Sequence, residues 1–324
     1  MKKSLEALAK ESSYAIVLGI GGGGDVVGAL PTSRYLRQLG LRTLLGGLTW
    51  ERYVNDPEPG PRKMEEIVDI KRLSATVGLA NSRTQTTKGI RFTESAVAEV
   101  LKEEILLVDL NRGVQGVIDG LNETIEQLGI DLFVGVDVGG DVLADGSEEG
   151  LKSMLADSMV LASMINLKVP TVLGVLGCCT DGELNFEQFS QQFAKVAGYG
   201  GFLGARGLTP DDLRALDEVI PNTKTESSAL AAKAARGLLG EIEIRGGYRK
   251  VQLTPMSAMT LYLDPRVVFD RVNGVAKELV PTRNLEEAQG VLERLGVPSE
   301  LTFERKYVWK RYSASDKYFG GQKK

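Results

Sequence analysis

The feature that most constrains the fold is a run of glycines directly after a short apolar segment. Residues 14–18 read YAIVL, and the chain continues through Leu18-Gly19-Ile20-Gly21-Gly22-Gly23-Gly24-Asp25 into a helical stretch. An apolar strand, a glycine-rich turn and a helix in this order are typical of α/β folds. Consecutive glycines permit unusual backbone conformations and leave their amides open to a ligand. We therefore expect Gly21, Gly22, Gly23 and Gly24 to hold a phosphate or carboxylate group; the alternative is a tight turn without a ligand.

Apolar segments and helical segments alternate through the first two thirds of the chain. Strands are expected at Tyr14–Leu18, Arg42–Leu45, Ile105–Leu110, Leu132–Val136 and Thr171–Leu176, and helices at Val26–Leu39, Val114–Leu128 and Leu151–Asn166. Strands that are apolar on both faces indicate an α/β, Rossmann-like and mostly parallel sheet with helices on both faces. The regular alternation of apolar strands and helices ends near Gly207. We therefore predict a Rossmann-like domain over 1–207 and an α+β region over 208–324. That C-terminal region packs either separately or as an extension of the same domain.

Local signals divide the C-terminal region into helices and a hairpin. Thr209 followed by Pro210 is a helix start, and Asn284 with Glu287 resembles a capping box. Helices are expected at Asp211–Glu218, Ser228–Leu239 and Leu285–Leu295, a hairpin at Glu241–Arg245 and Tyr248–Leu253, an edge strand at Arg305–Tyr312, and a frayed end at Gln322-Lys323-Lys324. Because Arg305–Tyr312 alternates basic and aromatic residues, it is also the one segment typical of nucleic-acid binding.

The absence of histidine restricts the available chemistry. The 324 residues contain no histidine and two cysteines, the neighbours Cys178 and Cys179. A Ser-His-Asp triad, a histidine-ligated metal and a four-cysteine zinc site are therefore excluded. Proton transfer then depends on carboxylates, lysine, tyrosine, cysteine or water. We expect the two cysteines to be buried and inert, because no histidine can activate them.

Acidic residues follow several predicted strands. They are Asp25, Asp109, Asp137, Asp141, Asp181 and Glu183. Ligands of open α/β sheets bind beyond the carboxyl ends of the strands, so these acids are expected at one edge. Clustered carboxylates repel one another and need a cation, a proton or basic partners. We therefore predict a Mg²⁺ or Mn²⁺ site at Asp25, Asp137 and Asp141, with Asp137, Asp141 and Asp181 as catalytic residues; the alternative for each acid is a helix cap or a turn.

Three further segments supply candidate ligand contacts. Glu51 follows the second strand, where an NAD site carries an acid for the ribose. Arg62 ends the proline-rich segment 56–62 and would neutralise a bound anion, and Arg83 and Lys88 belong to a polar loop over 81–89 with the same potential. For both segments the alternative is an ordinary surface loop.

Charge and hydropathy limit the partners. There are 39 Lys and Arg against 43 Asp and Glu, giving a net charge of −4, so nothing indicates nucleic-acid binding overall. The N-terminus lacks the apolar stretch of a signal peptide, and no apolar run reaches transmembrane length. We expect a cytoplasmic protein without a membrane partner, and a homo-oligomer is compatible with these features.

The motifs together resemble a family of archaeal and bacterial proteins known as domain of unknown function eleven fifty-two. The resemblance extends over roughly residues 14 to 312 and is carried by the segments 21–27, 47–52, 59–62, 135–141 and 181–184. It implies a Rossmann-like fold but no established activity. Where relatives carry one cysteine before Asp-Gly-Glu, this chain has Cys178-Cys179-Thr180, a departure that argues against a thiol mechanism.

Three functions fit these observations. The leading hypothesis is an enzyme of hydrolase or transferase type that binds a nucleotide or phosphorylated metabolite together with a divalent metal. The alternatives are an NAD-dependent oxidoreductase and a non-catalytic ligand-binding or assembly protein.

Overall fold

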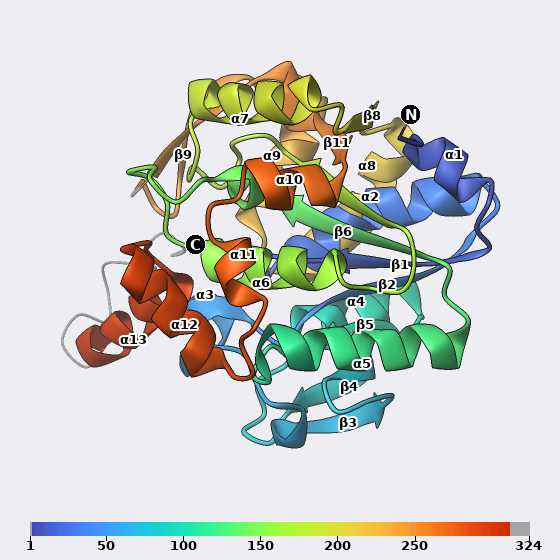
Figure 1. Cartoon of the computed structure of the whole chain (residues 1–324), viewed down its shortest axis with the longest axis vertical. Helices are drawn as coiled ribbons and strands as arrows, with labels where there is room; N and C mark the ends of the chain where they lie inside the picture. The colour runs from blue at the N-terminus through green and yellow to red at the C-terminus, as the bar shows by residue number, and fades with distance from the viewer. Residues whose placement is uncertain (1, 248, 312–324) are drawn as a thin grey trace.

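The computed structural model describes residues 2–247 and 249–311, and its centre is one nine-stranded sheet (Figure 1). In spatial order the strands are β3 (Ile67–Arg72), β4 (Val77–Thr86), β5 (Ile105–Val108), β2 (Arg42–Leu48), β1 (Tyr14–Gly19), β6 (Leu132–Val138), β7 (Thr171–Leu176), β11 (Met259–Leu263) and β8 (Phe202–Gly207). The five central strands, β5 to β7, are parallel, whereas the two strands at each edge are antiparallel. This confirms the predicted α/β class and adds antiparallel edges.

Two apolar cores cover the two faces of the sheet. Successive side chains of β1 alternate between them: Ile16 and Leu18 lie in one core, and Ala15 and Val17 in the other. The first core also contains residues of α5 (Gly113–Leu128), α6 (Met154–Met164), α7 (Phe186–Gly198), α10 (Pro265–Arg271), α11 (Ala276–Leu279), α12 (Leu285–Leu295) and α13 (Glu300–Arg311). The second contains residues of α1 (Leu5–Ala9), α2 (Asp25–Gln38), α4 (Thr93–Leu101), α8 (Pro210–Val219) and α9 (Glu226–Ala235). The central strands are therefore apolar on both sides, as their sequences indicate.

The C-terminal region shares the main sheet with the N-terminal region. β11 pairs with β7 at Thr260↔Leu176 and with β8 at Thr260↔Arg206, so residues after 207 supply an inner strand of the sheet. The predicted hairpin is present as β9 (Gly240–Ile244) and β10 (Arg249–Leu253), which form a separate two-stranded sheet. Tyr248 of the predicted hairpin lies outside the described residues.

Two predictions for polar segments are wrong. Residues 305–311 belong to helix α13, not to an edge strand; Tyr312 and Gln322–Lys324 lie outside the described residues. Residues 81–86, expected in a loop, form the second half of β4, in which Gln85 and Thr86 pair with β3. The short α3 (Arg52–Asn55) and 3₁₀ turns at Met64–Glu66, Asp141–Leu143, Ile220–Asn222 and Pro255–Ala258 complete the secondary structure.

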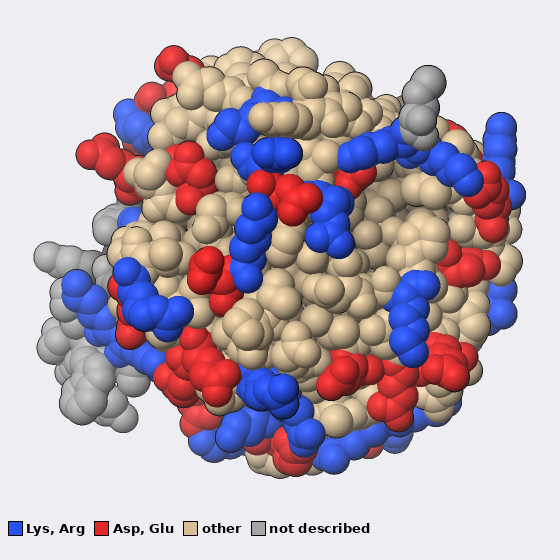
Figure 2. All heavy atoms as spheres, in the orientation of Figure 1, with Lys and Arg blue, Asp and Glu red and all other residues tan. Residues whose placement is uncertain are grey.

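The face of the molecule shown in Figure 2 gives little indication of a polyanionic partner. On the face shown in Figure 2, basic and acidic side chains are interspersed. Within the described residues, no helix combines the length and apolar character that a bilayer crossing requires.

Candidate functional site

The central strands create a switch point between β1 and β6. From β1 the chain first passes to β2 on one side, and later adds β6 on the other side, with both strands parallel to β1. In open parallel sheets such a reversal of strand order opens a crevice at the carboxyl ends. The glycine loop leaves β1 at this point, and Asp137 lies near the end of β6. The fold thus brings two predicted elements of the site to one place.

Three carboxylates converge at this switch point. Asp25 begins α2, Asp137 belongs to β6, and Asp157 comes from the first turns of α6. One oxygen of each lies within 4.8 Å of an oxygen of both others. Asp157 is 1% exposed, and its Oδ1 has no hydrogen-bond partner among the described residues. We call Asp25, Asp137 and Asp157 the acid cluster.

The acid cluster is electrostatically unfavourable when all its members are ionised. Burial raises the pKa of Asp25 to about 7, against the opposing effects of a hydrogen bond from Gly21 and the charge of Arg52. Burial and neighbouring carboxylates raise the pKa values of Asp137 and Asp157 well above the ordinary aspartate range. The cluster therefore holds protons at neutral pH unless a cation replaces them.

The glycine loop packs closely around these acids. The amide of Gly21 donates to Asp25 Oδ2 at 2.9 Å, and the amide of Gly23 donates to the carbonyl of Trp50 at 2.7 Å. A Cβ atom at Gly21 would lie 2.6 Å from Asp25 Oδ2 and 3.1 Å from Asp157 Oδ1. Glycine is thus required here by close approach of the carboxylates. Two of the four predicted anion-binding amides are used within the protein.

Arg52 supplies the nearest positive charge. Its guanidinium donates to the carbonyl of Gly21, lies 3.1 Å from Glu300 Oε1 and stacks 4.7 Å from the ring centre of Trp50. Although burial opposes it, the charges of Glu300 and Glu304 raise the pKa of Arg52, so it stays a cation. Arg52 holds its backbone at φ 56°, an uncommon conformation for a non-glycine residue.

Three of the other predicted acids, Asp141, Asp181 and Glu183, lie near the acid cluster. Asp141 accepts a hydrogen bond from Ser153 Oγ at 3.1 Å, and burial with the nearby charge of Asp157 raises its pKa well above the ordinary range. Burial raises the pKa of Asp181 to about 7, and its Oδ2 is buried without a partner. Glu183, by contrast, is fully used: it accepts from Ser153 and from the amide of residue 152, and it pairs with Arg249 at 3.2 Å.

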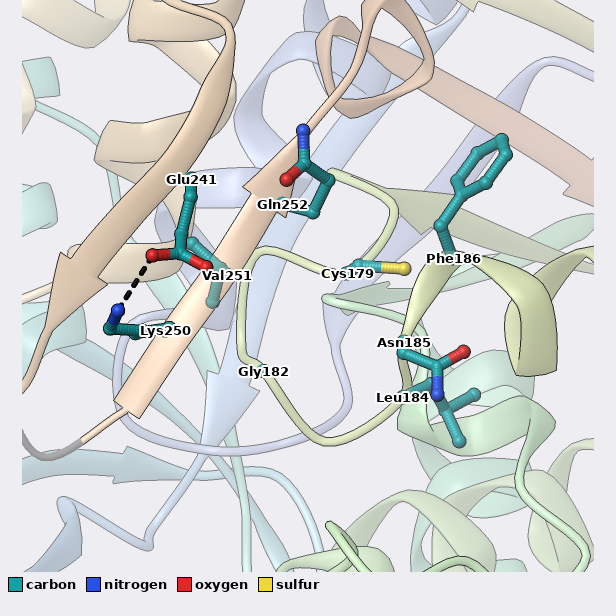
Figure 3. A pocket seen from close by; sticks show the side chains of 9 residues that line it. All are labelled: Cys179, Gly182, Leu184, Asn185, Phe186, Glu241, Lys250, Val251 and Gln252. Atoms are coloured by element: carbon teal, nitrogen blue, oxygen red, sulfur yellow. Dashed lines mark hydrogen bonds and ion pairs between the residues drawn. The ribbon is translucent and has the colours of Figure 1, made fainter.

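The cysteines follow β7 and are both 2% exposed, which confirms that they are buried. Their Sγ atoms lie 3.4 Å apart. Contact with Cys179 and burial raise the pKa of Cys178, so its thiol stays protonated at neutral pH. Cys179 lines a cavity of about 170 Å³ between the loop after β7 and the β9–β10 hairpin (Figure 3).

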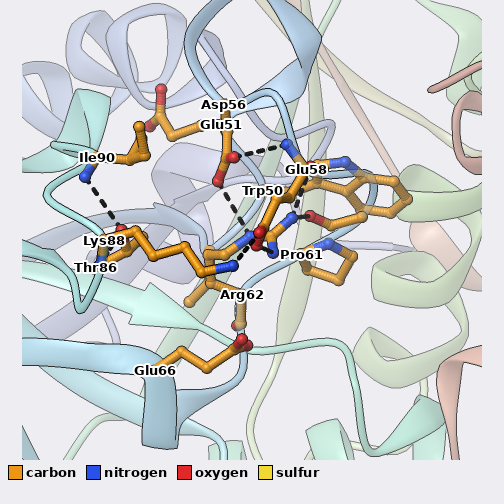
Figure 4. A network of polar contacts seen from close by, with 12 residues as sticks. Trp50, Glu51, Asp56, Glu58, Pro61, Arg62, Glu66, Thr86, Lys88 and Ile90 are labelled. Atoms are coloured by element: carbon orange, nitrogen blue, oxygen red, sulfur yellow. Dashed lines mark hydrogen bonds and ion pairs between the residues drawn. The ribbon is translucent and has the colours of Figure 1, made fainter. Parts of the chain in front are cut away.

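Arg62 lies in a different network, which shapes the proline-rich segment (Figure 4). Its guanidinium is 3.0 Å from Asp56, bonds Glu58 at 2.9 Å, and donates to the carbonyls of Glu58, Pro59 and Gly60. Its backbone amide donates to Thr49. The segment therefore folds around Arg62: its two terminal nitrogens donate hydrogen bonds within the segment, and its Nε forms an ion pair with Asp56 without hydrogen-bond geometry.

Glu51 and Asp109 also have local partners. Glu51 accepts hydrogen bonds from the amide and hydroxyl of Thr93, at the start of α4, and from Asn55. Asp109 accepts from the amides of Met64 and Asn111. Arg83 remains on the surface, with its side chain 78% exposed. These contacts direct none of the three toward the acid cluster.

Sequence reasoning missed two residues of the site. Asp157 is one charged residue in the otherwise apolar and small stretch MLADSMVLASM, and every residue of that helix is buried. A lone acid in a buried helix is a signal that could have identified it. Arg52 offered no such signal, because its role depends on Glu300 from the far end of the chain.

Comparison with protein families assigns the chain to one family. The family described as protein of unknown function (DUF1152) matches residues 16–308, so the chain belongs to that uncharacterised family. Neither the curated proteins nor the solved structures include a significant match.

Proposed function

We propose that the acid cluster binds a Mg²⁺ or Mn²⁺ ion, and that the protein is a metal-dependent hydrolase or transferase for a nucleotide or phosphorylated metabolite. Two observations on the buried Asp157 support the proposal: its Oδ1 has no partner among the described residues, and its carboxylate offers an oxygen within 4.8 Å of oxygens from Asp25 and Asp137. A buried carboxylate oxygen without a donor is costly, and a hard cation removes that cost.

The spacing of the acid cluster suits such an ion. Mg²⁺–oxygen distances of about 2.1 Å place ligand oxygens about 3 to 4 Å apart in an octahedron. The three oxygens lie within 4.8 Å of one another, so small side-chain rotations bring them to that spacing. Mg²⁺ usually retains several water ligands and also binds substrate phosphate. This explains how a phosphate and a group of acids can share one crevice.

The neighbouring residues supply the remaining chemistry. Asp181, with a pKa of about 7, exchanges protons near neutral pH, which is the property of an efficient general acid or base. Asp141 accepts a hydrogen bond from Ser153 and adds a further carboxyl group near the acid cluster, since burial and the charges of Asp157 and Asp137 raise its pKa. The amides of Gly22 and Gly24, which have no acceptor among the described residues, remain available to a phosphate.

Metal titration tests the proposal. Manganese EPR is expected to show one bound ion per wild-type chain, and a metal concentration of 100 times Kd is expected to stabilise the fold by about 2.7 kcal/mol. Asp137→Asn should lose both effects. Asp131→Asn is the control, because Asp131 lies before β6 at the opposite end and is bonded to Ser13 and Tyr14. Equal metal responses in wild type and Asp137→Asn, or none in wild type, would reject the site.

The ligand class needs a second titration. ADP is expected to stabilise the metal-loaded protein further and to have little effect without metal, because the ion offsets carboxylate–phosphate repulsion. Quenching of NADH fluorescence without any response to ADP would instead favour the oxidoreductase alternative. Metal binding with no response to ADP, inorganic phosphate or NADH would support a non-catalytic role.

A further inference from the structure

We propose that Cys178 and Cys179 form an oxidation site, in which a small hydroperoxide that enters the adjoining cavity converts the two thiols into a disulfide between neighbouring residues. The proposal is independent of the metal site. These are the only two cysteines among the 324 residues, so no other disulfide can form within the chain.

The backbone after β7 holds the two thiols together. In a strand, neighbouring side chains point to opposite faces. Here the chain leaves β7 through Gly177 at φ 73° and turns again at Cys179, φ 64°, and the two Sγ atoms come to 3.4 Å. A positive φ at a cysteine is uncommon, so the surrounding structure must maintain this turn.

Fixed contacts on both sides hold the turn in place. The amide of Cys179 donates to the carbonyl of Gly139 at 2.7 Å, which ties the turn to the end of β6. The carbonyl of Cys178 accepts a hydrogen bond from Ser257 at 3.0 Å. The thiols are therefore already positioned, and bond formation requires mainly that the sulfurs approach from 3.4 Å to about 2.05 Å.

The cavity beside Cys179 gives a small oxidant a route to this residue, although Cys179 is only 2% exposed. Its volume of about 170 Å³ is several times the roughly 30 Å³ that a water molecule occupies. Leu184, Phe186 and Val251 line it together with Cys179, whereas Cys178 does not (Figure 3). Cys179 is therefore the thiol that meets the oxidant, and Cys178 is the second thiol that completes the reaction.

The reaction balances with hydrogen peroxide as the oxidant. Cys179 sulfur attacks one peroxide oxygen, the O–O bond breaks, and the second oxygen leaves as water with the thiol proton, giving a sulfenic acid. Cys178 sulfur then attacks the sulfenic sulfur, and the hydroxyl leaves as water with the second thiol proton. Two thiols lose two electrons in total, and peroxide gains them. Because adjacent Cα atoms are about 3.8 Å apart, less than in ordinary disulfides, the product is readily reduced.

Mass spectrometry of the peptide that contains Cys178 and Cys179, taken from the folded chain after peroxide treatment, tests the proposal, because peroxide also adds oxygen to methionines and the chain has seven. The wild type is expected to lose two hydrogens and to recover them with dithiothreitol. Cys178→Ser is expected to gain one oxygen, and Cys179→Ser to stay unmodified. A urea-unfolded wild-type sample shows that the peroxide dose suffices to oxidise accessible thiols.

Three results would overturn the proposal. The first is a folded wild type that stays reduced at a dose that oxidises the unfolded chain. The second is a wild type that gains oxygens without losing hydrogens. The third is loss of two hydrogens from Cys178→Ser, which would indicate a bond to a backbone nitrogen. Because the folded and unfolded wild type are compared directly, the test does not depend on either variant folding.

Discussion

Two largely buried groups of charged residues in this protein differ in how fully their carboxylates are partnered. Around Arg62, every carboxylate faces a donor: Asp56 and Glu58 face the guanidinium, and three carbonyls accept from it (Figure 4). In the acid cluster, Asp157 keeps a buried oxygen without a donor, and Asp25 and Asp137 add like charges.

The difference separates a structural network from a binding site. A buried charge with complete partners holds the chain in one conformation, and removing a partner exposes the cost of burial. A buried charge without a partner carries that cost already, and a ligand can remove it. Substitutions in the two groups should therefore change stability in opposite directions.

The largest expected effect of a single substitution is on the partnered group. Arg62→Ala leaves Asp56 without its ion-pair partner and three backbone carbonyls without their donor, so we expect the free energy of unfolding to fall by about 3–5 kcal/mol. Urea unfolding followed by circular dichroism measures the loss. Arg83→Ala is the matched control, because Arg83 is 78% exposed and 3.8 Å from Asp69, and it should cost less than about 1 kcal/mol. Equal losses in the two variants would show that the Arg62 network contributes little.

Much of the fold could be predicted from the sequence because its centre is parallel. The predicted range of β7 agrees with the structure at both ends, and β1, β2 and β6 begin where expected. Apolar residues on both strand faces produce a clear signal there. β4 was missed because its second half, at the antiparallel edge, is polar and partly exposed. The alternating basic and aromatic residues of 305–312 favour an edge strand, although residues 305–311 end helix α13, in which Leu301 packs into a core and Glu304 accepts a hydrogen bond from Trp50.

The site was predictable only where it follows a strand end. Asp25 and Asp137 could be found because ligands gather at the carboxyl edge of a parallel sheet. Asp157 reaches the same place from inside a helix, and its proximity depends on how α6 packs on β6. Arg62 appeared to be a free cation, since nothing in the sequence shows that its own loop provides its acceptors.

The raised pKa values near the acid cluster predict that stability depends on pH. Asp25 and Asp181 have pKa values of about 7 in the folded chain, against 3.8 ordinarily, so the folded protein binds more protons between these limits. Stability is therefore expected to decrease as pH rises from about 4 to about 8, by about 4 kcal/mol for each of the two groups.

Urea unfolding without metal at a series of pH values measures this decrease, and Asp25→Asn should show a shallower slope. Acids with a lowered pKa, such as Asp131, make stability increase with pH instead. Because both wild type and Asp25→Asn contain these acids, their effect cancels in the comparison. A wild-type slope equal to that of Asp25→Asn would show that Asp25 does not hold its proton in the folded state.

The smallest predicted changes in the free energy of unfolding differ in sign between an acid of the cluster and a hydrogen-bonded acid elsewhere. Asp157→Asn removes one like charge from the acid cluster while keeping nearly the same shape, so the metal-free protein should gain about 1–2 kcal/mol of stability near pH 8. Asp131→Asn should instead lose about 1–2 kcal/mol, because it weakens hydrogen bonds that a carboxylate accepts from Ser13 and Tyr14. Thermal unfolding of wild type and both variants, with a chelator present, measures whether each substitution raises or lowers stability. If Asp157→Asn loses stability as Asp131→Asn does, then Asp157 is a structural acid, and the distinction between the two groups of charges disappears.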